Sequence, residues 1–283
     1  MTHPLALAQA FLFVPANRPD RFAKSLASRA DAVIVDLEDA VPLSEKAAAR
    51  DAIRRDLTPW LEQCPQRLVL RINACGTPFW DDDLRLVEAL GMRHLMLPKT
   101  ESVEQLSSVT SALSFTPVLI PMIESAKGVD QLKAIAAHPN TLRLSLGNID
   151  LQLSLGLQCG PDELELLPVR HQILLASRLA EIAAPIDGVT VQIESQAQLS
   201  ADILRAKRLG FRAKLCIHPK QVDGVIEGFQ PSAQEVEYAQ AVVAADKAAN
   251  GGVVQLNGKM VDRPVVMLAQ SVLAQAHMYP CTP

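Results

Sequence analysis

Short hydrophobic runs alternate with longer segments of mixed character along most of the chain. The runs are rich in Val, Ile and Leu and lack polar alternation, which is typical of parallel strands covered on both faces. We therefore predict eight strands in this part of the sequence. They are Phe11–Val14, Ala32–Val35, Leu68–Leu70, His94–Leu97, Pro117–Ile123, Leu142–Leu146, Ile182–Ile186 and Lys214–Ile217.

The segments between these runs carry apolar residues at helical spacing, so we predict amphipathic helices there. One long Ala-rich helix is expected from Ser44 to Leu61, with Ser44 as its N-cap. The other predicted helices are Asp20–Arg29, Asp81–Leu90, Val103–Leu113, Arg170–Glu181 and Ala197–Leu209.

Most of the hydrophobic runs are followed by a charged or polar residue. The mean spacing between these residues is about 30, the length of one strand–helix unit. Eight such units that close on themselves form an α/β fold, the (β/α)₈ TIM barrel, and this is our leading interpretation; a doubly wound open sheet is the alternative. In a barrel these residues would gather at the carboxyl ends of the strands, where active sites lie. They are Asp36, Arg71, Lys99, Glu124, Asp150, Asp187 and His218.

The last part of the chain is not needed to complete a barrel. It predicts a helix over residues 234–250, a hairpin over 253–261 with Asn257-Gly258 at its turn, and a helix over 264–278. We therefore expect a catalytic barrel domain, residues 1–230, and a C-terminal helix-hairpin-helix extension, residues 231–283. The extension is expected to pack on the barrel or on a neighbouring subunit.

The composition excludes several classes of function. The net charge is −4 and no basic stripe is present, so we expect no nucleic-acid partner. The five cysteines are scattered without CxxC spacing, which argues against disulfides and a zinc site. We find no signal peptide and no apolar run long enough to span a membrane, and we expect a cytoplasmic protein without a membrane partner. Dinucleotide, P-loop, serine-hydrolase and zincin signatures are also missing.

Glu124 and Asp150 are the leading candidates for a metal site. They are 26 residues apart and follow neighbouring hydrophobic runs. Parallel strands would place both carboxylates at the same end of the barrel, where they could hold Mg²⁺ together with water and substrate oxygens. The alternative is that each carboxylate caps the helix that follows it.

An acidic cluster, Asp36, Glu38 and Asp39, follows another predicted strand. Such carboxylates can orient metal-bound water without touching the metal. A structural role is the alternative, with Asp39 paired to Lys46 or Arg50.

Arg71 and Lys99 are the candidate cations at the strand ends. A guanidinium can hold a carboxylate with two hydrogen bonds and stabilise an oxygen that gains negative charge. The alternative for both residues is an ion pair with the acidic cluster. The basic residues Arg18, Arg21 and Lys24 could bind a phosphate at a helix N-terminus or simply be surface charges.

Several motifs follow one another in an order that is specific to one enzyme family. They are Phe13-Val14-Pro15 with Arg18-Pro19, Val35-Asp36-Leu37-Glu38-Asp39-Ala40-Val41, Leu70-Arg71-Ile72-Asn73, Leu97-Pro98-Lys99, Ile123-Glu124-Ser125, Gly147-Asn148-Ile149-Asp150-Leu151, Ile217-His218-Pro219 and Gly258-Lys259-Met260-Val261-Asp262. Together they cover nearly the whole chain, which resembles the citrate lyase β-subunit-like branch of the HpcH/HpaI aldolases.

The resemblance implies a (β/α)₈ barrel, usually a homotrimer, that binds Mg²⁺ and acts on carboxylated acyl thioesters. It assigns the metal to Glu124 and Asp150 and the keto acid to Arg71. It places Lys24, together with Arg18, near the phosphates of CoA or of a carrier protein.

By the same resemblance, Asp262 is an acid/base supplied by the C-terminal segment of an adjacent subunit. The sequence departs from the family pattern at Ala16, where Gly is more common, and at Ile149, where an acidic or small residue is more common.

We therefore expect a Mg²⁺-dependent carbon–carbon lyase that cleaves a citryl-, malyl- or citramalyl-CoA type thioester to a keto acid and an acyl thioester. Arg71, Asp262, Asp36 and Glu38 are the expected catalytic residues, and Lys99 is expected to help bind the substrate. The alternatives are a subunit of a citrate lyase complex acting on a citryl carrier protein, a malate synthase-like or thioesterase activity, and a catalytically silent subunit.

Overall fold

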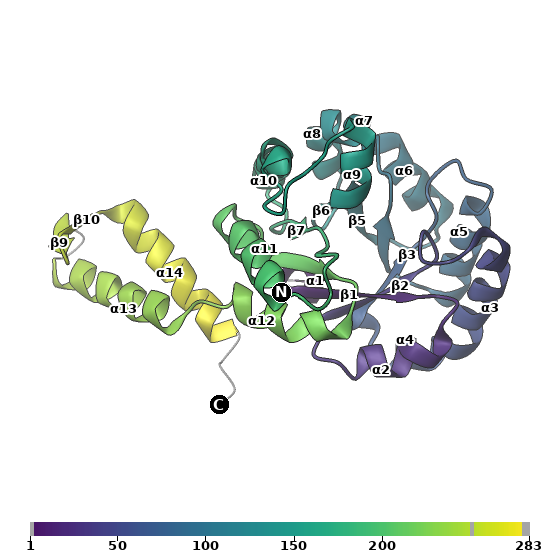
Figure 1. Ribbon diagram of the computed structural model, residues 1–283, viewed down its shortest axis with the longest axis horizontal. Coiled ribbons are helices and arrows are strands. Elements are labelled where there is room, and N and C mark those ends of the chain that lie inside the picture. Colours follow the sequence, from purple (N-terminus) through teal and green to yellow (C-terminus); the bar gives the residue numbers. More distant parts are fainter. Residues whose placement is uncertain (1–2, 250–251, 279–283) are drawn as a thin grey trace. The chain divides into compact units, whose positions relative to one another are not determined.

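Eight parallel strands close into a barrel in the first part of the chain (Figure 1). The computed structural model describes residues 3–249 and 252–278. Each strand pairs with the next one in the sequence, and β1 pairs with β8 to complete the ring. The closed ring confirms the predicted (β/α)₈ barrel and excludes an open sheet. The strands are β1 (Ala10–Pro15), β2 (Ala32–Asp36), β3 (Leu68–Arg71), β4 (His94–Leu97), β5 (Val118–Ile123), β6 (Ser145–Leu146), β7 (Ile186–Asp187) and β8 (Ala213–Cys216).

Two of the predicted strands are much shorter than expected. β6 and β7 have two residues each, although each lies at the end of a longer hydrophobic run that we predicted to be a strand. In β7 the cause is Pro185, which has no backbone N–H to donate to a neighbouring strand. The Ala183 N–H still donates to the carbonyl of Leu142 at 3.0 Å, so the hydrophobic run predicted the segment but not the bounds of its regular strand pairing.

The predicted helix from Ser44 to Leu61 is wrong as a single element. It is split into a 3₁₀ turn η2 (Leu43–Glu45) and the helices α3 (Lys46–Asp56) and α4 (Thr58–Gln63). Pro59 lies in the first turn of α4, where a missing N–H is tolerated, and it prevents one continuous helix. Ser44 is inside η2 and caps nothing.

The remaining helices of this part of the chain surround the barrel (Figure 1). They are α1 (Pro4–Leu7), η1 (Pro19–Arg21), α2 (Phe22–Leu26), η3 (Pro65–Arg67), α5 (Trp80–Leu90), α6 (Val103–Ala112), α7 (Ala126–Asp130), α8 (Leu132–Ala136), α9 (Asn148–Leu155), η4 (Leu164–Leu166), α10 (Leu167–Leu179), α11 (Gln196–Arg208), η5 (Pro219–Gln221) and α12 (Val222–Phe229). Five of them, α2, α5, α6, α10 and α11, were predicted to within a few residues. The short helices α1, α7, α8, α9 and α12 were not predicted, and α9 contains Asp150.

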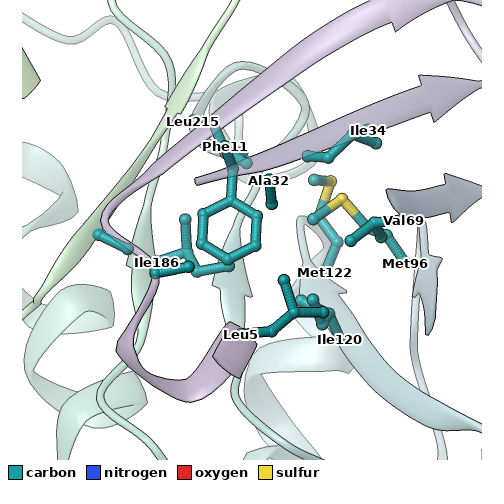
Figure 2. Packing of buried hydrophobic residues seen from close by; sticks show 12 residues of the cluster. Leu5, Phe11, Ala32, Ile34, Val69, Met96, Ile120, Met122, Ile186 and Leu215 are labelled. Atoms are coloured by element: carbon teal, nitrogen blue, oxygen red, sulfur yellow. The ribbon is translucent and has the colours of Figure 1, made fainter. Parts of the chain in front are cut away.

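The barrel interior is a packed hydrophobic core (Figure 2). Ile34 of β2 and Met122 of β5 belong to this core. Asp36 and Glu124 come two residues later in the chain, and side chains two residues apart on a strand point to the same side. Arg71 follows the core residues of β3 in the same way. The alternation that builds the core thus directs charged groups to the mouth of the barrel.

The chain divides into two compact units, Met1–Ile226 and Glu227–Pro283. In the second unit α13 (Ala233–Ala248) and α14 (Arg263–Met278) pack on each other and are joined by a hairpin of β9 (Val254–Leu256) and β10 (Lys259–Val261). Asn257 and Gly258 have φ angles of +50° and +77°, as expected for the type I′ turn.

Asn250, the predicted last residue of α13, is outside the described residues. A search of the described helices finds none with the length and apolar character needed to cross a membrane. The expected packing of the extension, residues 231–283, stays a prediction.

Candidate active site

A cavity of about 740 Å³ opens at the carboxyl ends of the barrel strands. Asp36, Arg71, Glu124 and Asp150 all line it. The four side chains come from the ends of β2 and β3, from the residue after β5 and from the first turn of α9. Residues that are far apart in the sequence therefore share one site.

Arg71 is held rigidly at the floor of this cavity. Its Nε and Nη2 donate to the two carboxylate oxygens of Asp36 at 2.7 and 2.6 Å, and its Nη1 is 3.1 Å from Oε2 of Glu38. The guanidinium also lies over the ring of Phe13, 4.7 Å from the centroid. Burial alone would lower the pKa of Arg71, but the two carboxylates outweigh it and raise the pKa further above its usual range. Arg71 therefore stays charged while facing the cavity.

Lys99 contacts both the acidic cluster and Glu124, the candidate metal ligand. Its Nζ binds Glu38 and lies 3.5 Å from the exposed carboxylate of Asp39. Its backbone N–H donates to Oε1 of Glu124 at 2.5 Å. Lys99 has a φ of +47°, a conformation that non-glycine residues adopt rarely and mostly at functional sites. Lys99 is not among the side chains that line the cavity.

The partners proposed for Asp39, Lys46 and Arg50, are wrong, and its carboxylate lies near Lys99 instead. Nζ of Lys46 donates instead to the backbone carbonyls of Leu37 and Glu38, at 2.6 and 2.7 Å. Arg50 pairs with the acidic first turn of α5. Lys46 thus fixes the loop that carries Glu38 without neutralising its carboxylate.

Glu124 is buried and its carboxyl group lies in an acidic environment. Burial and the neighbouring carboxylate of Glu38 raise the pKa of Glu124 to about 8, with Asp150 adding to the shift, although the Lys99 N–H and Arg71 oppose it. Gly147 makes room for this side chain, since a Cβ at residue 147 would lie 2.6 Å from the Cβ of Glu124.

Asp150 lies in the first turn of α9 and is partly exposed. Within residues 3–249 and 252–278, no cation lies within ion-pair distance of its carboxylate. These described residues also contain no cluster of three or more His, Cys, Asp or Glu side chains suited to a metal. Two carboxylates are sufficient for Mg²⁺, because this ion keeps several waters and also takes substrate oxygens.

The charge around the cavity fits a divalent cation. Among the described residues, carboxylates outnumber cations in and beside the cavity by six to four: the carboxylates are those of Asp20, Asp36, Glu38, Asp39, Glu124 and Asp150, and the cations are Arg21, Lys24, Arg71 and Lys99. A bound Mg²⁺ would offset the excess and would favour the ionised form of Glu124.

The other candidate residues are more dispersed. Lys24 lines the cavity, as does Arg21, whereas Arg18 is not a lining residue and pairs with Asp20 at 2.8 Å. His218 lines the cavity and caps η5 by accepting a hydrogen bond from the Lys220 N–H at 3.2 Å.

Asp262 belongs to the second unit, where its Oδ1 accepts the Val265 N–H at 3.2 Å at the start of α14. This contact is a helix cap, and the catalytic role of Asp262 stays a prediction. The roles of the other site residues also stay predictions, although the structure brings Asp36, Glu38, Arg71, Glu124 and Asp150 together.

Three further contributors to the site were missed from the sequence. Phe13 stacks under Arg71, Met122 lies 3.9 Å from the Arg71 guanidinium, and Asn148 is a buried amide at the start of α9. The first two could have been found by continuing the two-residue alternation of β1 and β5 to the strand ends. Asn148 gives no such signal.

The sequence matches the family model described as HpcH/HpaI aldolase/citrate lyase over residues 9–219. The chain belongs to this family. The match spans every strand of the barrel and all of the cavity residues named above, whereas Asp262 of the second unit lies outside it.

Individual members of the HpcH/HpaI aldolase/citrate lyase family match almost the full length of the chain. Citrate lyase subunit beta of Leuconostoc mesenteroides subsp. cremoris is 33% identical, with 96% of this chain and 94% of that protein covered. A (3S)-malyl-CoA thioesterase of Cereibacter sphaeroides is 30% identical, with 98% and 97% covered. The crystal structure of CitE from Mycobacterium tuberculosis with magnesium, acetoacetate and coenzyme A matches with a TM-score of 0.86 and 34% identity, covering 96% and 99% of the two chains.

Proposed function

We propose that the protein is a Mg²⁺-dependent carbon–carbon lyase. It cleaves a 3-hydroxy-3-carboxyacyl thioester of the citryl-, malyl- or citramalyl-CoA type to a keto acid and a shorter acyl thioester. The observation that carries this proposal is the placement of Glu124, Asp150 and Arg71 in one cavity. The family relatives that act on citrate or malyl-CoA, and the CitE complex with magnesium and coenzyme A, support it.

Glu124 and Asp150 would hold the metal. When bound, Mg²⁺ supplies Lewis acidity toward the oxygens of the substrate. The chain contributes the orientation of Glu124, because the Lys99 N–H fixes one carboxylate oxygen and leaves the other free. Lys99 therefore acts by positioning Glu124 and Glu38 and does not need to touch the substrate.

Arg71 would stabilise the oxygen that changes from hydroxyl to ketone. Its charge is permanent and its orientation is fixed by Asp36 and Glu38, so no reorganisation is needed during the reaction. We assign Asp36 and Glu38 to the catalytic unit in this sense, as the groups that aim the guanidinium.

The proton balance requires one donor near the thioester. Cleavage of the carbon–carbon bond leaves the electron pair on the α-carbon of the acyl thioester as an enolate, which must gain a proton, while the substrate hydroxyl loses one. We assign both proton transfers to Asp262, supplied by another copy of the chain. As the acid/base that the family resemblance implies, it takes the proton that the hydroxyl loses and delivers a proton to the enolate. Homo-oligomerisation, with a trimer as the expected state, is part of this proposal, and the expected cytoplasmic location stays a prediction.

The phosphates of the thioester carrier require cations at the rim of the cavity. Lys24 and Arg21 are exposed cavity residues and are suited to this role. Arg18 could join them only by giving up its contact with Asp20.

The decisive experiment is a panel of citryl-, malyl- and citramalyl-CoA incubated with the purified chain, with Mg²⁺ or with EDTA. We expect a keto acid and an acyl-CoA only when Mg²⁺ is present. Asp150→Ala should abolish turnover, and Glu165→Gln, which changes an exposed carboxylate outside the cavity, should not. Unchanged cleavage and metal affinity in Asp150→Ala would refute the assignment.

The same panel tests a second candidate function, hydrolysis of the thioester, which the similarity to a malyl-CoA thioesterase favours. Free CoA in place of acyl-CoA among the products indicates hydrolysis. When citryl bound to a carrier protein is added to the panel, turnover of this substrate alone indicates a citrate lyase subunit. No Mg²⁺-dependent turnover of any thioester indicates a catalytically silent subunit.

A further inference from the structure

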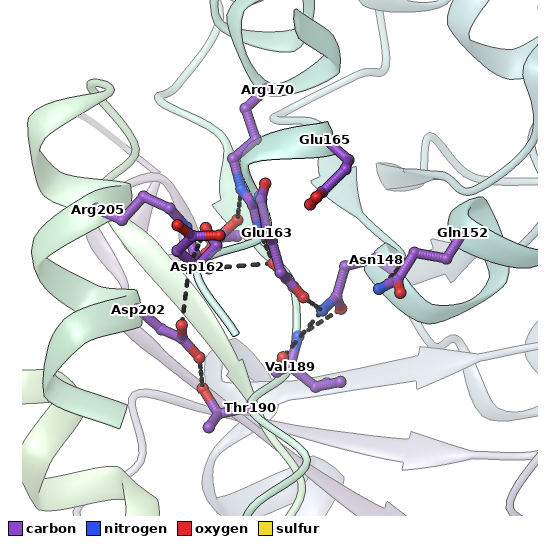
Figure 3. A network of polar contacts seen from close by, with 12 residues as sticks. Asn148, Gln152, Asp162, Glu163, Glu165, Arg170, Val189, Thr190, Asp202 and Arg205 are labelled. Carbon is purple, nitrogen blue, oxygen red and sulfur yellow. Dashed lines mark hydrogen bonds and ion pairs between the residues drawn. The ribbon is translucent and has the colours of Figure 1, made fainter. Parts of the chain in front are cut away.

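A network of polar contacts ends at Asn148, the first residue of α9 (Figure 3). Asn148, at the start of the helix, is buried and uses both ends of its amide. Its Nδ2 donates to Oε1 of Glu163 at 2.8 Å and to the carbonyl of Val189 at 3.1 Å, and its Oδ1 accepts the Val189 N–H at 2.9 Å. Asn148 is therefore tied to two separate segments of the chain.

Glu163 is the centre of the network. Its backbone has a φ of +46°, which places the carboxylate between α9, α10 and α11. Oε2 accepts from Arg170 and, at 3.1 Å, from Arg205, while Oε1 is left for Asn148. Figure 3 shows the Glu163 side chain pointing toward Asn148.

Arg170 anchors this assembly to the barrel. It is almost fully buried, and its Nε donates to Asp187 at the end of β7 at 2.8 Å. Nζ of Lys214, from β8, lies 3.4 Å from the same carboxylate and donates to the carbonyl of Gly188 at 2.7 Å. A Cβ on residue 188 would lie 2.8 Å from the Cβ of Asn148, so a glycine is needed there.

Asp150 depends on this anchorage more than Glu124 does. Glu124 has the Lys99 N–H as a direct partner, whereas Asp150 has no ion-pair partner among the described residues. The direction of the Asp150 carboxylate is therefore set by the backbone of the first turn of α9. The Asn148 side chain ties that turn to Glu163 and to Val189.

We propose that Asn148 and Glu163 are positioning residues for the metal carboxylate Asp150. This inference rests on the proposed function, because it requires Asp150 to bind Mg²⁺. Neither residue needs to touch the metal or the substrate. They hold α9 so that Asp150 can share a metal with Glu124, as groups outside a metal's own ligands commonly do.

The test is a calorimetric titration of the full chain with Mg²⁺ in the absence of substrate. We expect Asn148→Ala and Glu163→Gln each to weaken Mg²⁺ binding by about tenfold or more. Glu165→Gln is the matched control, since it makes the same chemical change at an exposed carboxylate two residues away and should alter affinity by less than about twofold.

Two variants are needed because they affect the fold differently. Glu163→Gln weakens the ion pairs of Arg170 and Arg205, whereas Asn148→Ala leaves those pairs in place and removes only the connection to α9. Circular dichroism at the titration temperature shows which variants are folded. A purely structural role would lower the melting temperature of the metal-free protein and leave the affinity of the folded protein unchanged.

Unchanged Mg²⁺ affinity in a folded Asn148→Ala protein would overturn the inference. If the unaltered chain itself does not bind Mg²⁺, the proposed metal site is what has failed. The two failures are therefore distinguishable in one set of titrations.

Discussion

Glu124 carries a carboxyl group whose surroundings favour the neutral acid. Burial and the carboxylate of Glu38 raise its pKa to about 8 from an ordinary value of 4.5. A metal ion binds only the ionised form, so metal and proton compete for this side chain. Near neutral pH the metal-free protein therefore holds a proton on Glu124 that Mg²⁺ must displace.

We predict that Mg²⁺ binding at pH 7 releases close to one proton and that affinity falls as the pH is lowered below about 8. Calorimetry in buffers of different ionisation enthalpy measures the number of protons released. The Glu124→Gln variant, whose amide cannot ionise, should bind Mg²⁺ weakly and release no proton. Binding at pH 7 without proton release would contradict the raised pKa.

The same shift links stability to pH in the metal-free protein. Because the folded pKa is higher than the unfolded one, the folded state binds the proton more tightly. The resulting stabilisation is fully present below about pH 4.5 and is lost as the pH rises through about 8. Bound Mg²⁺ replaces the proton on Glu124 and so removes this loss of stability at high pH.

Gly147 is the second residue on which the site depends. We predict that Gly147→Ala lowers the free energy of unfolding by about 1–3 kcal/mol, because the new methyl group overlaps the Cβ of Glu124, which cannot rotate away. Mg²⁺ affinity should fall as well, since Glu124 must shift.

Gly160→Ala is the control for this substitution. There the nearest atom to a new Cβ is a carboxylate oxygen of the exposed side chain of Asp162, at 3.3 Å, which can move. Urea titrations and Mg²⁺ titrations of both variants measure the effects. Equal effects of the two substitutions would argue against the steric explanation.

At the scale of elements, buried charges connect the helix layer to the barrel. Asp187 at the end of β7 is fully buried between Arg170 of α10 and Lys214 of β8. Burial alone would raise the pKa of Asp187, but the two cations outweigh it and lower the pKa. These partners are needed because a buried charge without compensation is costly.

We predict that Asp187→Ala lowers the free energy of unfolding by about 3–5 kcal/mol, because it leaves two cations buried without this partner. Adding Lys214→Met should restore part of the loss, since one of the uncompensated charges is then removed. Urea denaturation measures both variants. Glu194→Ala, which breaks the exposed pair with Lys220, should leave the unfolding midpoint unchanged.

The elements themselves were largely predictable. The hydrophobic runs predicted all the barrel strands, since a strand that is buried on both faces must be apolar along its length. Some errors occur where a proline overrides the pattern: Pro59 divides a predicted helix and Pro185 shortens β7. The others are the short helices α1, α7, α8, α9 and α12, which were not predicted; α9 begins before Asp150 in a segment expected to be a loop.

At the scale of the whole molecule, the open question is how the second unit takes part in the reaction. The proposed acid/base, Asp262, lies in that unit, whereas the cavity residues come from the first. If Asp262 acts in the cavity of another copy, then a copy whose own cavity is inactive can still supply Asp262 to a copy that lacks this residue.

We predict that two inactive variants complement each other. Glu124→Gln and Asp262→Asn should each have little activity alone. When both are expressed together, mixed oligomers contain some sites with both groups intact, so the activity should exceed the sum of the separate variants. Cleavage of the thioester by the co-purified proteins is the measurement. Activity equal to that sum would show that Asp262 does not act between copies.

The sequence alone determined an α/β fold built of parallel strand–helix units, with a barrel as the leading interpretation, and the residue types available to the site. Strand periodicity and the spacing of about 30 residues are local properties, and a charged residue after a buried run can be read directly from the chain. The ordered motifs also carried the family resemblance, because they are short local patterns that can be recognised along the chain.

Only the tertiary structure decided how these residues act on one another. Sequence patterns left Arg71 with two alternatives, and the fold shows it both paired with Asp36 and facing the cavity. The raised pKa of Glu124 and the anchorage of α9 by Asn148 also arise from groups that are distant in the chain. Such interactions depend on distance and burial in space, which closure of the barrel creates and local sequence does not record.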